Sequence, residues 1–126
     1  MKIELRRFQP KDFYKLTAII DKDTAIIAGL TWPFDRESAM SFICEYNTWG
    51  IYHSEVLLGA IEIRSNLETA YLVGRQWRGK GIATQAVKLI KEQFADKQLW
   101  CLINPENRAS LRVAQKAAMR ITYYNG

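Results

Sequence analysis

The sequence of 126 residues is poor in the residues that build metal sites, disulfide frameworks and membrane spans. It has one histidine, His53, and two cysteines, Cys44 and Cys101, without ligand-like spacing, so we expect no metal and no disulfide. Both cysteines lie in apolar stretches, which predicts buried free thiols in a reducing compartment. No apolar run approaches the roughly 20 residues of a membrane span, and the N-terminus lacks a signal-peptide core. We therefore expect a cytoplasmic protein without membrane contacts.

The net charge is positive, and the basic residues do not cluster in the sequence. The formal net charge is +5, and lysines and arginines are spread along the chain without clustering. No nucleic-acid-binding motif is present, so we expect no nucleic-acid partner, and a polyanionic ligand explains the charge equally well. A hydrophobic fraction of 48% in this length predicts a single domain over residues 1–126 with a substantial core.

The most informative stretch is residues 67–96. An apolar, β-prone run, Tyr71-Leu72-Val73, precedes a turn with two glycines, Gly79 and Gly81. A helix is predicted directly after this turn, because apolar residues recur there with a 3.6-residue period: Ile82, Ala86, Leu89, Ile90 and Phe94. The first N–H groups of a helix have no intrahelical partner, and glycines let the backbone approach a ligand closely. The turn is therefore suited to a phosphate or diphosphate, or serves chain geometry alone.

The remaining periodicities predict a mixed architecture of the α+β or α/β class. We expect a mostly antiparallel sheet with about four helices, since the short connections between residues 49–54, 56–64 and 67–73 indicate a meander of strands. A strand–helix–strand crossover predicts that 99–102 lies parallel to 67–73, with a V-shaped splay between them. A first strand is expected at residues 2–7. Helices are expected at about 12–20, 36–47, 82–96 and 108–118, and Asp12, Asp35 and Asn107 are the expected N-caps of the first, second and fourth of these. Residues 21–32 form either a short helix or an irregular apolar run.

Two motifs resemble the GCN5-related N-acetyltransferases (the GNAT superfamily). The turn Arg78-Gly79-Lys80-Gly81-Ile82-Ala83 matches the signature Q/R-x-x-G-x-G/A, and residues 107–116 resemble N-x-x-S-x-x-V-x-x-K. The resemblance covers nearly the whole chain and is nearest to the ribosomal-protein alanine N-acetyltransferase branch. It implies an acetyl-CoA-dependent transfer to a primary amine, on a small molecule or peptide, by direct attack in a ternary complex. The alternative is an acyl-CoA-binding module of the same fold with little or no catalysis.

The resemblance also implies roles for individual residues. Acetyl-CoA would be held by Leu72, Val73, Arg78, Gly79, Lys80, Gly81, Ile82, Ala83, Thr84, Asn104, Asn107 and Ser110. Glu68 would be the general base, with Glu62 as second candidate; the competing interpretation of Glu68 is a surface residue at a strand end. Trp32 and Phe34 would contact the acceptor, or would instead be core aromatics between helices.

Two positions depart from the family pattern. Relatives carry a proton-donating tyrosine where this chain has Ala114, and a Gly-Phe pair where it has Ala118-Met119. Either Tyr123 or Tyr124 supplies the proton, or the thiolate leaves unassisted, which we favour because a thiol is a tolerable leaving group near neutral pH. Only one short strand fits after Arg120, and the open sheet edge that this implies predicts a homodimer.

Overall fold

The computed structural model describes residues 1–44 and 47–124. In chain order, its strands are β1 (Glu4–Arg7), β2 (Thr48–His53), β3 (Val56–Ile63), β4 (Thr69–Val73), β5 (Trp100–Ile103) and β6 (Arg120–Tyr123). Its α-helices are α1 (Phe13–Ile19), α2 (Lys22–Ala28), α3 (Arg36–Cys44), α4 (Ile82–Gln93) and α5 (Arg108–Lys116). Short 3-10 turns lie at Pro10–Asp12 and Arg75–Trp77. The architecture is therefore the mixed α and β arrangement expected from the sequence.

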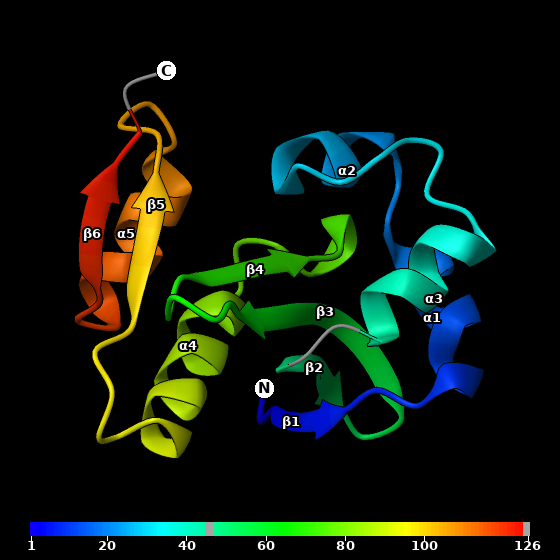
Figure 1. Cartoon of the computed structure of the whole chain (residues 1–126), viewed down its shortest axis with the longest axis horizontal. Coiled ribbons are helices and arrows are strands. Elements are labelled where there is room, and N and C mark those ends of the chain that lie inside the picture. The colour runs from blue at the N-terminus through cyan, green and yellow to red at the C-terminus, as the bar shows by residue number, and fades with distance from the viewer. Residues whose placement is uncertain (45–46, 125–126) are drawn as a thin grey trace.

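The strands form an antiparallel meander and a separate parallel pair (Figure 1). In the first sheet the order is β1-β2-β3-β4, with every neighbouring pair antiparallel. In the second, β5 and β6 run parallel, with Trp100 opposite Arg120. The predicted meander and the predicted strand in the tail are both confirmed.

Among the described residues, hydrogen bonds join the two sheets at one end, where β4 and β5 begin. A parallel bridge joins Glu68, just before β4, to Trp100 at the start of β5. The Trp100 amide donates to the Leu67 carbonyl oxygen at 3.3 Å, and the indole nitrogen donates to the Asn66 carbonyl oxygen at 2.9 Å. Beyond this point the strands diverge, as Figure 1 shows. The splay expected between residues 67–73 and 99–102 is thus present, and its open end lies toward the start of α4.

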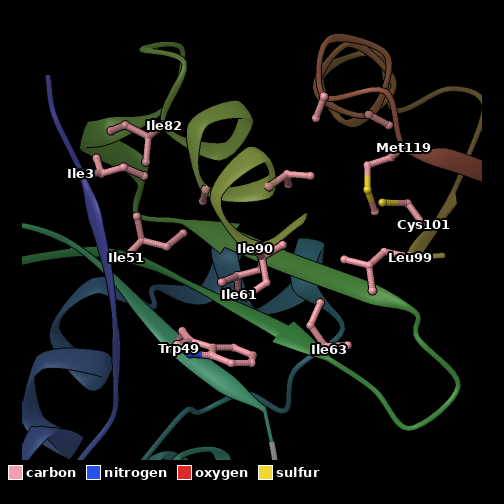
Figure 2. Close-up of a cluster of buried hydrophobic side chains, with 14 of the residues drawn as sticks. Ile3, Trp49, Ile51, Ile61, Ile63, Ile82, Ile90, Leu99, Cys101 and Met119 are labelled. Atoms are coloured by element: carbon pink, nitrogen blue, oxygen red, sulfur yellow. The ribbon is translucent and has the colours of Figure 1, made fainter. Parts of the chain in front are cut away.

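Two hydrophobic clusters cover the two faces of the meander. The larger joins the sheet to α4, α5 and β5, and its fully buried members include Ile51, Ile61, Val87 and Ile90. Figure 2 shows Ile90 and Ile61 beside each other, and Cys101 facing Met119. The smaller cluster joins α1, α2 and α3 to the opposite face through Leu16, Ile20, Ala25, Phe34 and Ala39. Of the apolar stripe that predicted α4, Ile82, Ala86 and Ile90 are buried. Leu89 and Phe94 are partly buried against the cluster, and Val87 is buried although the prediction did not include it.

The predicted caps are mostly confirmed. Asp35 accepts from the Ser38 amide at 2.9 Å, and Asn107 accepts from the Ser110 amide at 3.1 Å. Asp12 occupies the N-cap position of α1 as predicted, but its side chain makes no capping bond there. Its carboxylate accepts instead from the amide of Gln9 at 2.8 Å and closes the preceding 3-10 turn. The stretch left open at 21–32 contains α2, capped by Asp21.

Other expectations need correction or fall outside the described residues. Cys44 is exposed, so its predicted burial is wrong, whereas Cys101 is buried as expected. The helix predicted over 36–47 is described only to Cys44, since residues 45 and 46 lie outside the described part. α5 ends at Lys116, two residues earlier than predicted, and Ala118 then takes a left-handed conformation with φ of 55°.

Candidate cofactor-binding and active site

A cavity of about 550 Å³ lies where β4 and β5 diverge. Its walls come from α2, β4, the loop between β4 and α4, the first turn of α4, and one face of α5. Most of the cofactor contacts expected from the sequence lie on this wall: Leu72, Val73, Arg78, Gly79, Gly81, Ile82, Ala83, Thr84, Asn107 and Ser110. The structure thus brings together residues from two motifs that lie more than twenty positions apart in the chain.

The loop before α4 presents unpaired main-chain amides to the cavity. Within residues 1–44 and 47–124, no acceptor receives a hydrogen bond from the amides of residues 79–84, and Gln85 is the first to bond back into the helix. Gly79 and Gly81 have φ values of 76° and 77°, which L side chains rarely adopt, and a β-carbon added at either one would meet no atom within 4 Å beyond its chain neighbours. These amides and the positive end of the helix dipole therefore form a seat for an anion.

Arg78 ties this loop to α2. Its Nε donates to the Val73 carbonyl oxygen at 3.0 Å, and its Nη2 donates to the Thr24 hydroxyl at 2.6 Å. Arg75 continues the connection by donating to Asp21 at 2.8 Å and pairing with Asp23. These contacts hold α2 across the cavity from α5.

Asp21 is the centre of this connection. Hydrogen bonds from the hydroxyl and amide of Thr24, and then from Arg75, lower the pKa of Asp21 to about 2. Each of these donors favours the ionised carboxylate. The negative charge at the start of α2 is therefore retained at any ordinary pH.

β4 lies unusually close to β3 at the cavity. Gly59 on β3 is opposite Val73, and a β-carbon at Gly59 would collide with the Leu72 carbonyl oxygen. Only glycine permits this approach without moving β4. The position of Leu72 and Val73 on the cavity wall therefore depends on a residue of the neighbouring strand.

One face of α5 forms the wall opposite α2. Ala109, Arg112, Val113 and Lys116 line the cavity together with Asn107 and Ser110. Of these, only Asn107 and Ser110 were expected from the sequence. The other four could have been predicted from their spacing, because residues three or four positions apart lie on the same face of a helix. Arg112 and Lys116 add positive charge to the wall.

Two buried polar atoms on the wall lack hydrogen-bond partners. The Tyr71 hydroxyl and the Trp77 indole nitrogen have almost no surface open to water, and neither has a partner within the described ranges. Burial raises the pKa of Tyr71, an effect that the neighbouring Ser110 hydroxyl opposes and the Cys101 thiol reinforces. Burial likewise raises the pKa of Cys101 to about 11. Both groups are therefore neutral at physiological pH.

Several expected site residues lie away from the cavity wall. Glu68 is not part of the cavity lining. Its carboxylate pairs with Arg64 at 2.9 Å, and Arg64 also pairs with Glu62 at 3.2 Å. Tyr123 and Trp32 are about half exposed, and Phe34 is 7% exposed within the smaller core cluster. Lys80 is exposed beside the wall, and the Asn104 side chain accepts from the Glu106 amide at 2.9 Å. For Phe34, the structure agrees with the core interpretation.

The cavity is basic and apolar. Its charged members are Arg78, Arg112 and Lys116, and no acidic side chain of the described residues lines it. In the same part of the chain, no three His, Cys, Asp or Glu side chains come together in a way that could hold a metal ion. No helix within the described ranges combines the length and apolarity of a membrane span.

Solved structures of acetyltransferases share this fold. The microcin C7 self-immunity acetyltransferase MccE, solved with acetyl-CoA and AMP, has a TM-score of 0.71 at 18% identity, covering 92% of this chain and 77% of that one. An N-acetyltransferase from Staphylococcus aureus Mu50 has a TM-score of 0.66 at 18% identity, covering 92% and 82%. The ribosomal-protein-alanine N-acetyltransferase from Brucella melitensis biovar Abortus 2308 has a TM-score of 0.59 at 11% identity, covering 99% and 82%.

The fold and the anion seat at the start of α4 therefore define an acyltransferase-like α and β protein. A search of curated protein sequences found no significant match. The model of the acetyltransferase (GNAT) domain family, however, matches residues 2–120. The chain belongs to the GNAT acetyltransferase family, as its two motifs predicted.

Proposed function

We propose that this protein is an N-acetyltransferase that transfers the acetyl group of acetyl-CoA directly to a primary amine in a ternary complex. Residues 1–126 would act as one acetyltransferase-like domain. The observation that carries the proposal is the row of unpaired amides at residues 79–84, a segment that, apart from residue 80, lines a basic cavity of about 550 Å³. A polyanionic cofactor with an extended, partly apolar arm fits such a cavity better than a cationic or a purely apolar ligand.

The diphosphate of acetyl-CoA would lie on the amides of Gly79, Gly81 and Ala83. Lys80, exposed beside them, adds positive charge, while Arg78 positions the loop through its bonds to Val73 and Thr24. The pantetheine arm would follow β4 along Leu72 and Val73, where β5 has diverged and leaves that edge of the strand open. The side-chain nitrogen of Asn107 can donate to the arm, because the side-chain oxygen already accepts from the Ser110 amide.

The acceptor amine would enter beside α2. Ile27 and Ala28 line the cavity there, and the exposed Trp32 follows α2 in the chain. Glu68 is the proposed base, acting through a water because it does not reach the cavity wall. Its carboxylate pairs with Arg64 at 2.9 Å.

A second candidate function is acyl-CoA binding without efficient catalysis. The absence of acidic side chains from the cavity lining, within the described residues, favours it. Cofactor binding is common to both candidates, so binding alone does not distinguish them.

The test has two steps. Calorimetry with acetyl-CoA and with free pantetheine measures whether affinity depends on the diphosphate. Mass spectrometry after incubation with acetyl-CoA and an amine panel, including an alanine-initiated peptide and spermidine, then measures transfer. Binding with acetylated product supports the enzyme, binding without product supports the second candidate, and no binding refutes both.

We also propose that the protein forms a homodimer through β6. No described strand pairs with the outer edge of β6, where Thr122 and Tyr123 are exposed. An exposed strand edge is a template for pairing with a second chain. Light scattering at tens of micromolar should give the mass of a dimer, and a monomer would contradict this proposal.

A further inference from the structure

The side chains that α2 contributes to the cavity wall are apolar or already hydrogen-bonded. They are Thr24, Ile27 and Ala28. The Thr24 hydroxyl donates to Asp21 at 2.7 Å, accepts from Arg78 at 2.6 Å, and is buried. A ligand that approaches α2 therefore meets the hydrocarbon side chains of Ile27 and Ala28.

The two carboxylates at the start of α2 are occupied by other partners. One oxygen of Asp21 accepts from the amide and the hydroxyl of Thr24, and the other accepts from Arg75 at 2.8 Å. Asp23 also pairs with Arg75. Neither carboxylate lines the cavity. They hold α2 in place and do not offer a negative charge to a ligand.

The charged side chains that do line the cavity are positive. They are Arg78, Arg112 and Lys116, and within residues 1–44 and 47–124 no acidic side chain joins them. The present inference rests on the proposed function, in which the diphosphate lies on residues 79–84 and the acceptor enters beside α2. An acceptor with a second ammonium group would there lose water without gaining a carboxylate partner, and burying an unpaired charge is costly.

An apolar acceptor would instead gain a contact with Ile27. This side chain is 66% exposed although it lies on the cavity wall, so a hydrocarbon group placed against it removes apolar surface from water on both partners. The preceding residue, Ile26, is 62% exposed and does not line the cavity. What distinguishes Ile27 is therefore its position at the cavity and not its exposure.

We propose that the acceptor is a small primary amine that carries an apolar alkyl or aryl group and no second positive charge, and that Ile27 selects it. The apolar group would lie against Ile27 and Ala28, with the reacting amine directed away from α2 toward β4. Ile27 is a specificity-determining residue and takes no part in the chemistry. Polyamines such as spermidine should be poor acceptors.

The test compares hexylamine with 1,5-diaminopentane. Both have a primary amine on a chain of five methylenes, and they differ only at the far end, which is a methyl group in one and a second amine in the other. That second amine is charged near neutral pH, because the pKa of an alkylamine is about 10. With acetyl-CoA saturating, kcat/KM for CoA release should be at least about tenfold higher for hexylamine.

Two variants assign this preference to one side chain. Ile27→Asp supplies the missing carboxylate, and should lower the ratio of the two kcat/KM values at least about tenfold. Ile26→Asp makes the same change at the neighbouring residue of nearly equal exposure, outside the cavity lining. Its ratio should stay within about threefold of the wild type, because solvent and salt screen a surface charge. Since both amines are compared on the same protein, losses of folded protein or cofactor affinity cancel in the ratio.

A wild-type ratio below about tenfold overturns the inference, and this measurement needs no variant. An unchanged ratio in Ile27→Asp overturns it too, as does an equal fall in Ile26→Asp, which would mean a general effect of charge without contact. Acetylation of another amine of the panel but not of hexylamine has the same consequence. Failure of the wild type to bind acetyl-CoA, or to acetylate any amine, refutes the proposed enzyme instead, so the two failures are distinguishable.

Discussion

The two sides of the cavity are built from different parts of the polypeptide. On the side of α4, the polar groups without partners are main-chain amides, in a loop with two left-handed glycines. On the side of α2, the wall includes the side chains of Ile27 and Ala28, brought there by contacts between Asp21, Asp23 and Arg75. A site built from main-chain amides depends on the positions of glycines, which can be read from the sequence. A site built from side chains depends on how distant elements pack, which cannot be read from the sequence.

The largest effect should come from placing a carboxylate in the backbone site. Gly81→Asp puts a negative charge into the open space where the diphosphate would lie. We expect acetyl-CoA affinity to fall at least about a hundredfold, or about 2.7 kcal/mol, as measured by calorimetry.

Gly29 offers a matched control for that change. It has φ of 72° and open space around its α-carbon, as Gly81 does, but it ends α2 and is not on the cavity wall. Gly29→Asp should therefore carry a similar backbone strain without weakening acetyl-CoA binding. Equal loss of affinity in both variants would mean that strain, not charge, is responsible, and would remove the main support for the anion seat.

The second effect concerns β4, the strand along which we propose that the cofactor arm lies. In Gly59→Ala the new methyl group collides with the Leu72 carbonyl oxygen, so β4 must move away from β3. We expect a loss of about 1–3 kcal/mol in the free energy of unfolding, with weaker acetyl-CoA binding. In Gly50→Ala the added methyl meets side-chain atoms of Tyr52, Leu57 and Phe8, which can rotate. Its acetyl-CoA affinity should stay close to that of the wild type, and a comparable loss there would contradict the role assigned to β4.

A third, smaller effect is a gain in stability outside both sides of the site. Ala118 follows α5 with φ of 55°, and Lys91 donates at 2.9 Å to the carbonyls of Ala117 and Ala118. A left-handed conformation costs a non-glycine residue about 1–2 kcal/mol. Ala118→Gly should therefore raise the free energy of unfolding by about 1 kcal/mol in denaturant titrations. The control, Ala117→Gly, has φ of −90° and should lower it.

The smallest effect is a pH dependence on the α2 side. Because the pKa of Asp21 is lowered from 3.8 to about 2, its contribution to stability is complete above pH 4 and is lost as pH falls toward 2. The protection factors of the α2 amides, in which the exchange rates are corrected for the intrinsic effect of pH, should therefore fall as the pH is lowered across that window. In Asp21→Asn this step should be absent; a step of the same size in the variant would assign it to another carboxylate.

The sequence predicted the fold well because its strongest periodicities are local. The stripe of α4, the short connections of the meander and the caps at Asp35 and Asn107 act within a few residues, and all are present. The Asp12 side chain does not cap α1, although the residue stands at the N-cap position, because a 3-10 turn at Pro10–Asp12 competes for the same carboxylate. The Cys44 prediction failed because an apolar neighbourhood in sequence does not determine which helix face is covered.

The candidate site was predictable only in part, for the same physical reason. Gly79, Gly81 and the start of α5 were found because their spacing is itself the signal. Tyr71 was not expected on the cavity wall, because the arrangement of β4 and α5 around the cavity is tertiary. The placement of Glu68 against Arg64 and outside the cavity lining depends equally on the fold.

The central claim is that the amides of residues 79–84 hold the diphosphate of coenzyme A. The most direct measurement is a titration of isotopically labelled protein, following the amide proton shifts of Gly79, Gly81 and Ala83. Coenzyme A should move these resonances downfield, because amides that donate to an anion are deshielded, while pantetheine, which lacks the diphosphate, should leave them nearly unchanged. If coenzyme A binds and these resonances do not move, or if both ligands move them equally, the claim is contradicted.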